Sequence, residues 1–479
     1  MNYEFRSKPF QHQLKFFEQT KEDKIHATLW EQGTGKTKFT IDTAAYLFQE
    51  DEIDAVFVVA PNAVHRGWLA DDELGVHCPE ELLGRSNILS FQSEKKGTQW
   101  HRRAVRDFFE ASGPKWMTMS YNGFMTDVGK KTAWDYLRNH RVLMVLDESS
   151  NIKNPDAKRT KSMIAAGAYP AYKRILDGTP VGNSAFDTYA QFRFLDPKFW
   201  KAHGINSSQM FKHFFGIWSE TKEGKPFPVG YQNLPLMREW ISPVSSRVLK
   251  KDVLDLPPKL YKKVRFPMTG EQQKLYDQLE KEFRAVLSTG EELTAELSIV
   301  RQLRLQQVTC GYLPTEDGNE PVHMIGKRNP RMDVMCELLE TLPHQAIIWA
   351  RFVLDIDQLM DRLGGRAVRF DGSVSPDDRE VAKARFKNGD YQFFVSNTQV
   401  GGAGLTLNTA KSMFYYSNSF KLRDRKQSED RNHRIGQDVS VLVTDLIAEN
   451  TIDEHIVDSL RKNHEVACEV TGDEVLEWL

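Results

Sequence analysis

The chain is poor in cysteine and has no long apolar stretch, and both absences narrow the class of protein. Its four cysteines among 479 residues lie far apart, so they form neither a paired zinc-ligand spacing nor a disulfide framework. No apolar run approaches the roughly 20 residues that span a bilayer. The first residues also lack the apolar core of a secretory signal. These absences predict a cytoplasmic protein with reduced thiols.

Length and charge set further bounds. At roughly 100–200 residues per domain, the chain is expected to hold two to four domains. Hydrophobic residues make up 40% and charged residues 27%, a balance typical of globular proteins. The formal net charge of −2 decides nothing about nucleic acid, because a phosphate backbone requires a local basic groove and not a basic total.

Strand-like apolar runs alternate with helical patterns in two stretches of the chain. The runs are continuous, which favours strands covered on both faces within a parallel sheet. They lie at 27–30, 55–60, 116–119, 142–146 and 174–176, and again at 346–349, 367–370, 393–395, 413–416 and 441–443. We therefore expect an α/β protein with one lobe over 1–195 and a second lobe with a C-terminal helix over 336–479.

The middle of the chain, residues 196–335, has a different pattern. Residues 272–287 and 291–308 carry apolar side chains at helical spacing, and no strong strand signal accompanies them. The pattern predicts a mostly helical protrusion and interlobe linker.

Residues 33–37 have the pattern of a phosphate-binding loop between a strand and a helix. Backbone N–H groups around the glycines would cradle phosphates, while the lysine contacts them and the last threonine coordinates Mg²⁺. The strict pattern has another glycine where this chain has Trp30, so a plain turn before an ordinary helix is the alternative. The nucleotide-binding candidates here are Gly33, Thr34, Gly35, Lys36 and Thr37.

Two carboxylates follow the apolar run 142–146. They would emerge at the carboxyl tip of a buried strand, the edge at which open α/β sheets bind ligands. ATP hydrolysis requires one carboxylate for the metal and one for the attacking water, and we assign Asp147 to Mg²⁺ and Glu148 to the water. An acidic N-cap on the next helix is the alternative.

A second charged motif lies in the C-terminal lobe. Gly404 would let the backbone approach a ligand closely, and Gln427, Arg431 and Arg434 are expected on one face of a helix. Arginine is suited to phosphate because its planar fork binds oxygens in pairs and stays charged. A solvated charged helix is the alternative.

Together these motifs resemble helicase superfamily two, and within it the Swi/Snf-type DNA translocases. The branch-level matches are Asp-Arg-Asn-His-Arg-Ile-Gly-Gln at 430–437, Leu-Pro-Pro-Lys at 256–259 and Thr-Ile-Asp-Glu at 451–454. The resemblance covers nearly the whole chain in the family's motif order, and the compact size resembles phage and bacterial members. It implies a bacterial or phage-infected host cytoplasm and a role in DNA repair or recombination.

The resemblance also implies a fold, cofactors and roles for particular residues. The fold is two RecA-like lobes with a helical protrusion, binding ATP and Mg²⁺ between the lobes and DNA across both. Gln13 would sense adenine, and Gln427 would belong to the nucleotide site with the two catalytic arginines. Residues near strand-contacting motifs are candidate nucleic-acid contacts, namely Arg66, Trp68, Ser120, Lys153 and Arg351. A solvated surface charge is the alternative for the three cations among them.

The chain departs from the family pattern in two places near the catalytic carboxylates. The family usually has a histidine two residues after the glutamate, and this chain has Ser149 and Ser150 after Glu148. In the family, that histidine couples the ATP site to the nucleic-acid groove. This chain lacks the histidine, so its sequence does not identify the residue that performs the coupling. Asp177 precedes a Gly-Thr-Pro turn at 178–180, where the family usually has threonine.

The leading prediction is a nucleic-acid-stimulated ATPase that moves on duplex, forked or branched DNA, most simply as a monomer. It would remodel DNA or migrate branches with limited unwinding, and single-stranded DNA is a further possible partner. One alternative is a processive helicase that separates DNA or RNA strands. The alternative of another class is a nucleic-acid-binding module without turnover.

Overall fold

The computed structural model describes residues 3–62, 64–71, 73–220, 226–289, 295–314, 322–400 and 405–475. The chain forms two compact units. The first unit contains Met1–Ile217, Pro228–Asp255 and Val466–Glu474, and the second contains Trp218–Phe227, Leu256–Glu465 and Val475–Leu479. None of the helices in the described ranges is long and apolar enough to cross a membrane.

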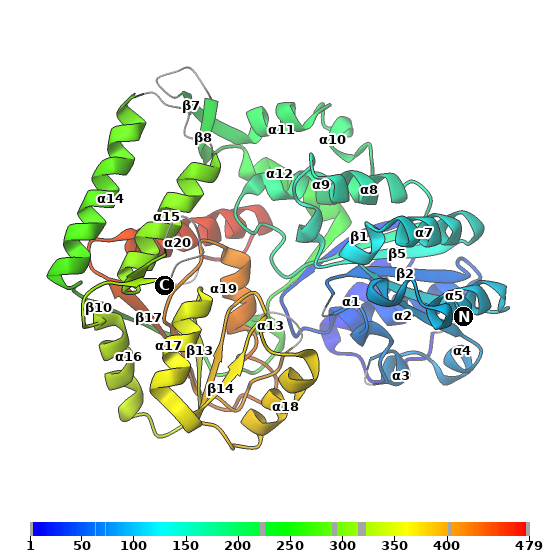
Figure 1. Ribbon diagram of the computed structural model, residues 1–479. Helices are drawn as coiled ribbons and strands as arrows, with labels where there is room; N and C mark the ends of the chain where they lie inside the picture. Colours follow the sequence, from blue (N-terminus) through cyan, green and yellow to red (C-terminus); the bar gives the residue numbers. More distant parts are fainter. Residues whose placement is uncertain are drawn as a thin grey trace. The chain divides into compact units, whose positions relative to one another are not determined.

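The first unit is built on a seven-stranded sheet with the order β3-β4-β2-β5-β6-β1-β9. All of its strand pairs are parallel. The central strands are buried along their whole length, as expected for apolar runs covered on both faces by helices (Figure 1). The strands are β1 (Ile25–Trp30), β2 (Ala55–Ala60), β3 (Asn87–Phe91), β4 (Lys115–Ser120), β5 (Val142–Asp147), β6 (Tyr172–Leu176) and β9 (Ser245–Val248).

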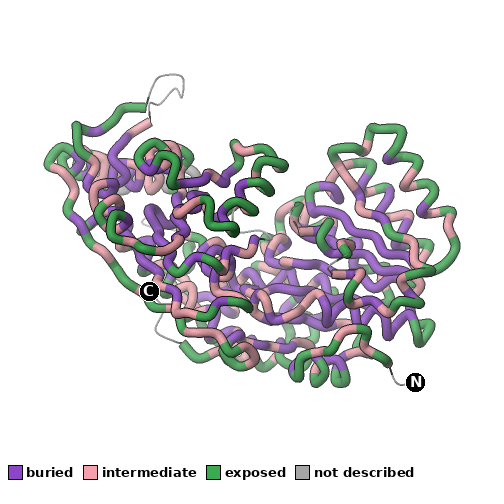
Figure 2. Tube along the Cα trace, turned by 90° about the horizontal axis from the view of Figure 1, so that it is seen from below, coloured by how far each residue is buried: buried purple, intermediate pink, exposed green. Residues whose placement is uncertain are grey.

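The second unit has a six-stranded parallel sheet with the order β10-β17-β16-β13-β15-β14. Two hydrophobic clusters form its core, one containing Ile348 and Phe414 and the other containing Ile347 and Phe394. Figure 2 shows that buried residues form continuous stretches along the chain, with exposed residues mainly at the periphery. The strands are β10 (Lys259–Phe266), β13 (Ala346–Trp349), β14 (Ala367–Phe370), β15 (Phe393–Ser396), β16 (Ser412–Tyr415) and β17 (Val441–Ala448).

The α/β fold class with two parallel-sheet lobes is confirmed, and every strand expected in the two lobes is present. Helices α17 (Val353–Leu363) and α18 (Pro376–Lys387) alternate with strands of the second sheet along the chain. The sequence pattern missed β3, whose Ile88 is exposed and whose run is interrupted by polar residues.

The middle segment is more than a helical protrusion. Helices α14 (Gly270–Thr289) and α15 (Ala295–Thr309) are present there, but β9 is an edge strand of the first sheet and β10 an edge strand of the second. A further two-stranded sheet joins β7 (Gly216–Glu220) and β8 (Pro226–Tyr231). Edge strands with one exposed face alternate polar and apolar residues, and β10 carries four cations, so no apolar run marks them.

Candidate active site

The phosphate-binding loop connects β1 to helix α2 (Lys36–Gln49). Gly33 and Gly35 have φ values of 82° and 84°, a left-handed conformation that glycine adopts without strain. The Thr34 hydroxyl donates to the Glu31 carbonyl at 2.7 Å and closes the turn. The loop therefore has the backbone form that leaves N–H groups at a helix N-terminus available to an anion.

Lys36 points back into this loop. Its Nζ donates to the carbonyl oxygens of Trp30 at 2.9 Å and Glu31 at 3.2 Å. Trp30, at the position of the missing family glycine, is fully buried and its indole donates to Ser246 Oγ at 2.8 Å. The departure at Trp30 thus leaves the loop intact, because only the Trp30 backbone faces Lys36.

Helix α1 (Gln11–Thr20) supports the loop from behind. The Gln13 amide donates to the Gly35 carbonyl at 2.9 Å and accepts from the Phe10 N–H at 2.8 Å. The His12 Nε2–H donates to the Thr34 carbonyl at 2.8 Å, and burial lowers the pKa of His12. Gln13 is thus bonded to the loop itself, and its predicted contact with adenine stays a prediction.

Asp147 and Glu148 stand at the carboxyl end of β5, as the sequence pattern predicts. Asp147 Oδ1 accepts the Glu148 N–H at 2.9 Å, and Glu148 Oε1 accepts from the side-chain amide of Gln32, a residue of the phosphate loop, at 3.1 Å. Glu148 has φ 53° and ψ 55°, an uncommon backbone conformation for a residue with a Cβ, and such conformations cluster at functional sites.

The electrostatics of Asp147 suit a cation ligand. Burial and then the neighbouring Glu148 raise the pKa of Asp147 to about 6, while the Trp68 hydrogen bond and the charge of Lys36 act in the opposite direction. A bound cation would favour the ionised form of such a carboxylate. One carboxylate together with one hydroxyl, for which Thr37 in the first turn of α2 is the candidate, matches the few protein ligands that Mg²⁺ takes when phosphates supply the rest.

Two predicted nucleic-acid contacts lie in the core of the first unit. Trp68 is 3% exposed, and its indole Nε1–H donates to Asp147 Oδ2 at 2.9 Å. Ser120 is 2% exposed, and its hydroxyl accepts the Gly123 N–H at 2.9 Å as a helix cap. Both side chains are engaged within the protein, and their contact with a nucleic-acid strand stays a prediction.

The remaining predicted contacts are placed differently. Arg66 is about half exposed and pairs with Glu94, which is also exposed. Lys153 Nζ lies 3.6 Å from Asp187, and Arg351 donates to the Gln306 side chain. These three cations keep the role of candidate contacts, now with known protein partners. Gly404 lies outside the described residues.

The departures at Ser150 and Asp177 belong together. Asp177 Oδ2 accepts the Ser150 N–H and Oδ1 accepts the Thr179 N–H, both at 2.7 Å. Asp177 is 1% exposed, so a buried carboxylate joins the segment after Glu148 to the Gly-Thr-Pro turn. Hydrogen bonds to an ionised acceptor are roughly twice as strong as neutral ones. No motif in the sequence indicates this pairing.

In the second unit the arginine motif is a turn segment and not a continuous helix. Helix α19 (Leu422–Glu429) ends before Arg431, so the expectation that 427, 431 and 434 share one helical face is wrong. The Asn432 amide donates to the carbonyls of Leu407 and Ala410 at 2.9 and 2.6 Å. Arg434 donates to the Leu405 carbonyl and Thr406 hydroxyl, both at 3.0 Å. These tertiary bonds hold the segment against residues 405–410.

A buried ion cluster anchors helix α19, which leads directly into this segment, to the sheet. Glu429 pairs with Lys259 of β10 at 2.5 Å and with Arg425 at 2.7 Å, and Arg425 also pairs with Asp445 of β17 at 2.5 Å. Burial alone would raise the pKa of Glu429, but Lys259 and Arg425 outweigh it and hold that pKa well below its usual range. We define these four residues as the anchor cluster.

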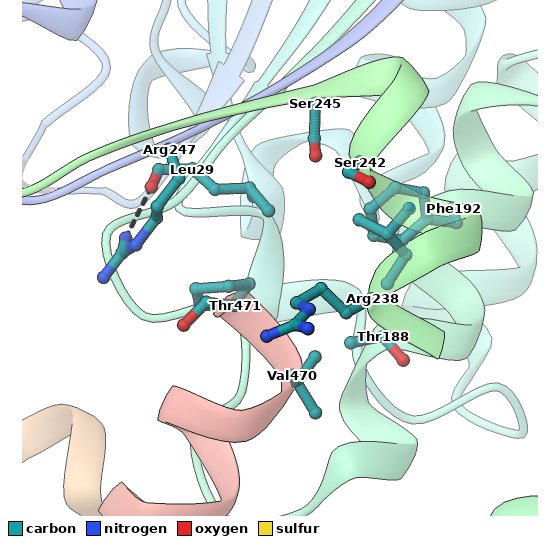
Figure 3. A pocket seen from close by; sticks show the side chains of 11 residues that line it. Leu29, Thr188, Phe192, Arg238, Ser242, Ser245, Arg247, Val470 and Thr471 are labelled. Carbon is teal, nitrogen blue, oxygen red and sulfur yellow. Dashed lines mark hydrogen bonds between the residues drawn. The ribbon is translucent and has the colours of Figure 1, made fainter. Parts of the chain in front are cut away.

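A separate cavity of about 110 Å³ lies in the first unit (Figure 3). Its wall includes Phe192 of α9 (Thr188–Leu195), Arg238 of α12 (Leu234–Ile241) and Val470 of α20 (Ile452–Thr471). Arg247 at its rim pairs with Asp473 at 2.7 Å. None of the predicted nucleotide-site residues lines it.

A phosphate loop facing paired carboxylates at the edge of a parallel sheet defines a nucleotide-binding α/β protein. The model of the SNF2-related domain matches residues 12–311, and that of the helicase conserved C-terminal domain matches residues 330–436. The first match covers more than half of the chain, which therefore belongs to the SNF2-related family.

Two similar proteins are named as components of chromatin-remodeling complexes. The chain is 26% identical over 453 residues to the ISWI chromatin-remodeling complex ATPase CHR11 of Arabidopsis thaliana, covering 90% of this chain and 39% of that protein. It is 24% identical to the SWI/SNF chromatin-remodeling complex subunit snf22 of Schizosaccharomyces pombe, covering 89% and 26%. The chain thus spans between about a quarter and two fifths of these relatives.

A solved structure is also similar. The Sulfolobus solfataricus SWI2/SNF2 ATPase core in complex with dsDNA matches with 21% identity and a TM-score of 0.43, over 98% of each chain.

Proposed function

We propose that this protein is an ATP-dependent DNA translocase of the Swi/Snf type. The observation that carries the proposal is the convergence of Lys36, Gln32, Asp147 and Glu148 at one edge of the first sheet in a chain of the SNF2-related family. The names of the relatives, which include a probable ATP-dependent DNA helicase of Arabidopsis thaliana, support the same activity.

Each residue of the loop and strand edge has a distinct task in the proposed reaction. The loop N–H groups and Lys36 bind the β- and γ-phosphates, and Thr37 and Asp147 hold Mg²⁺. When bound, Mg²⁺ supplies positive charge to the phosphate oxygens. Glu148 orients the attacking water and accepts its proton. Arg431 and Arg434 add positive charge to the transferred phosphoryl group during turnover.

The proposed partner is duplex, forked or branched DNA, bound by a monomer. Contacts to phosphates would dominate, so we expect little sequence preference and a steep fall of affinity with salt. Arg66, Lys153 and Arg351 are the candidate contacts. Because these three cations already contact partners within the protein, DNA binding would exchange one set of partners for another.

The decisive experiment measures the ATPase rate with single-stranded, duplex, forked and four-way DNA, with RNA as a control. We expect DNA to stimulate turnover and both Lys36→Ala and Glu148→Gln to abolish it. The matched control Lys383→Ala removes a lysine from an i,i+3 pair with Glu380 on α18 and should preserve the rate. Turnover indifferent to every nucleic acid would contradict the proposal.

The processive helicase is the second candidate, and DNA displacement assays distinguish it. A translocase strips the third strand from a triplex and leaves a fork paired, whereas a processive helicase opens the fork as well. A module without turnover would bind DNA and hydrolyse no ATP. The loop conformation and the paired carboxylates argue against that third possibility.

A further inference from the structure

Two loops at the edge of the first sheet converge on one catalytic residue. Strands β4, β2 and β5 are adjacent, and their register pairs Ala60 with Ser120 and Val59 with Leu146. The segments that follow these strands therefore begin at the same edge. Trp68 comes from the loop after β2, and Tyr121 begins helix α6 (Tyr121–Phe124) directly after β4.

Both aromatic side chains turn inward and bond to Asp147 at the end of β5. The Trp68 indole donates to Asp147 Oδ2 at 2.9 Å, and the Tyr121 hydroxyl donates to the Asp147 backbone carbonyl, also at 2.9 Å. The two donors are 3% and 2% exposed, so no water competes freely for these bonds. The loop after β2 thus holds the side-chain carboxylate of Asp147, and the segment after β4 holds the backbone of the same residue.

The orientation of the carboxylate depends on the first of these bonds. Asp147 Oδ1 accepts the N–H of Glu148, the next residue in the chain, and this bond fixes one carboxylate oxygen. Oδ2 is held by Trp68. A displacement of the Trp68 loop therefore rotates the carboxylate about its side-chain torsion, and a rigid flat ring transmits that displacement without absorbing it.

Each loop also has a polar side chain at the surface beside its buried ring. Arg66 precedes Trp68 by two residues and is about half exposed. Asn122 follows Tyr121, is exposed, and accepts a hydrogen bond from Arg159 at 2.6 Å. A phosphate backbone that binds Arg66 would compete with its contact to Glu94, and one that binds Arg159 would compete with its contact to Asn122. Either change would shift the loop that carries the contact.

The usual family residue for such communication is absent here. Ser150 stands where the family has a coupling histidine, and its buried hydroxyl has no hydrogen-bond partner among the described residues. Its backbone is engaged instead: the N–H donates to Asp177, and the carbonyl accepts the Lys153 N–H. The side chain of Ser150 therefore makes no hydrogen bond that could link it to Asp147.

We propose that Trp68 and Tyr121 are positioning residues that transmit nucleic-acid binding at their two loops to Asp147. This inference rests on the proposed function. The inference explains DNA stimulation of the ATPase by the hydrogen bonds of the Trp68 indole and the Tyr121 hydroxyl to Asp147, in place of the histidine that the family uses. Neither residue touches substrate, since both act through the metal-binding carboxylate.

The test is the stimulation ratio, the DNA-saturated turnover rate divided by the rate without DNA. Trp68→Phe removes the indole N–H and Tyr121→Phe removes a single oxygen. We expect the ratio to fall about tenfold in Trp68→Phe and by a smaller factor in Tyr121→Phe, as for loss of a bond to a charged and a neutral acceptor. The Kd for a blunt duplex, measured by fluorescence anisotropy, should change by less than about threefold, since phosphate contacts dominate it.

Two matched controls remove equally buried bonds elsewhere in the first unit. Trp200→Phe loses an indole bond to the Tyr189 carbonyl at 2.8 Å, and Tyr136→Phe loses hydroxyl bonds to the Val56 and Lys115 carbonyls. These variants should lose a similar amount of folding stability, through a lost hydrogen bond or a smaller ring, but the bonds they lose do not involve Asp147. We expect them to keep the stimulation ratio of the parent.

The outcomes separate the inference from the function on which it rests. A reduced ratio in the two variants, with the controls unchanged, supports the inference. A stimulated parent whose Trp68→Phe and Tyr121→Phe variants keep its ratio overturns the inference alone. A parent that no nucleic acid stimulates overturns the proposed function and the inference with it. If Trp68→Phe fails to fold, Tyr121→Phe decides.

Discussion

The phosphate loop of the first unit and the arginine segment of the second are both expected to meet phosphate, yet they are built by different physics. The loop takes its form from two left-handed glycines and hydrogen bonds to a neighbouring helix. The arginine segment is held by the anchor cluster and by bonds to carbonyls of residues 405–410. Local backbone preference builds the first site, and long-range electrostatics builds the second.

The comparison teaches where each site is vulnerable. A loop defined by backbone conformation should fail when a side chain is added. A segment defined by buried charges should fail when a charge is removed, even one that touches no ligand. The predictions below test this contrast, beginning with the largest effect.

Removing the arginines tests whether the second unit contributes to the reaction at all. Arg431→Ala and Arg434→Ala should each lower kcat by about 10³–10⁵-fold, the range measured for arginine fingers in phosphoryl transfer. ATP affinity, measured with a fluorescent analogue, should change far less. Arg385→Ala, which removes a half-exposed arginine paired with Asp390, is the control and should leave kcat as it is. Full turnover without Arg431 would contradict the comparison of the two segments as phosphate-binding sites, since the arginine segment would then have no catalytic role.

Removing a charge from the anchor cluster tests its structural role. Glu429→Gln leaves Lys259 with a neutral partner in a buried site, and a broken buried pair typically costs about 3–5 kcal/mol. We expect a clearly lower midpoint of thermal unfolding. Glu380→Gln, in a pair whose carboxylate is 71% exposed, makes the same chemical change and should alter stability by less than about 0.5 kcal/mol. Equal effects of the two variants would refute the anchoring role.

Adding a methyl group to the loop tests its dependence on backbone conformation. A Cβ on Gly35 would lie 2.2 Å from Gln13 Nε2, and its φ of 84° disfavours any side chain. Gly35→Ala should weaken ATP binding by about 10-fold or more, since left-handed strain of roughly 1–3 kcal/mol is added and the Gln13 bond is displaced. Gly84→Ala, where a Cβ meets nothing within 4 Å, should bind ATP like the parent.

Acid should weaken the anchor cluster in a defined direction. The folded pKa of Glu429 lies below its unfolded value of about 4.3, so the pair contributes fully above that pH and its contribution declines as pH falls. The difference in unfolding midpoint between the parent and Glu429→Gln should therefore narrow from pH 6 towards about pH 3. A difference that stays constant over this window would assign the stability to packing.

The sequence was a good guide to the first unit and a weaker one to the second. Apolar runs located the central strands because burial on both faces leaves an unbroken local signal, and the glycines of the loop are recognisable by spacing alone. Edge strands β3, β9 and β10 lack that signal. The arginine helix was expected to continue because charges at helical spacing favour it, but Asn432 bonds to carbonyls more than twenty residues away and ends it.

Sequence by itself determined the two parallel-sheet lobes and the family, and it proposed Lys36, Asp147, Glu148 and the two arginines as the chemical groups. Only the tertiary structure decided what surrounds them. It turned Trp68 from an expected surface contact into a buried donor to Asp147, and it joined Ser150 to Asp177. The physical reason is the sequence separation over which each interaction acts. Backbone preference and apolar periodicity act between neighbours in the chain, whereas a buried hydrogen bond depends on which strands lie side by side.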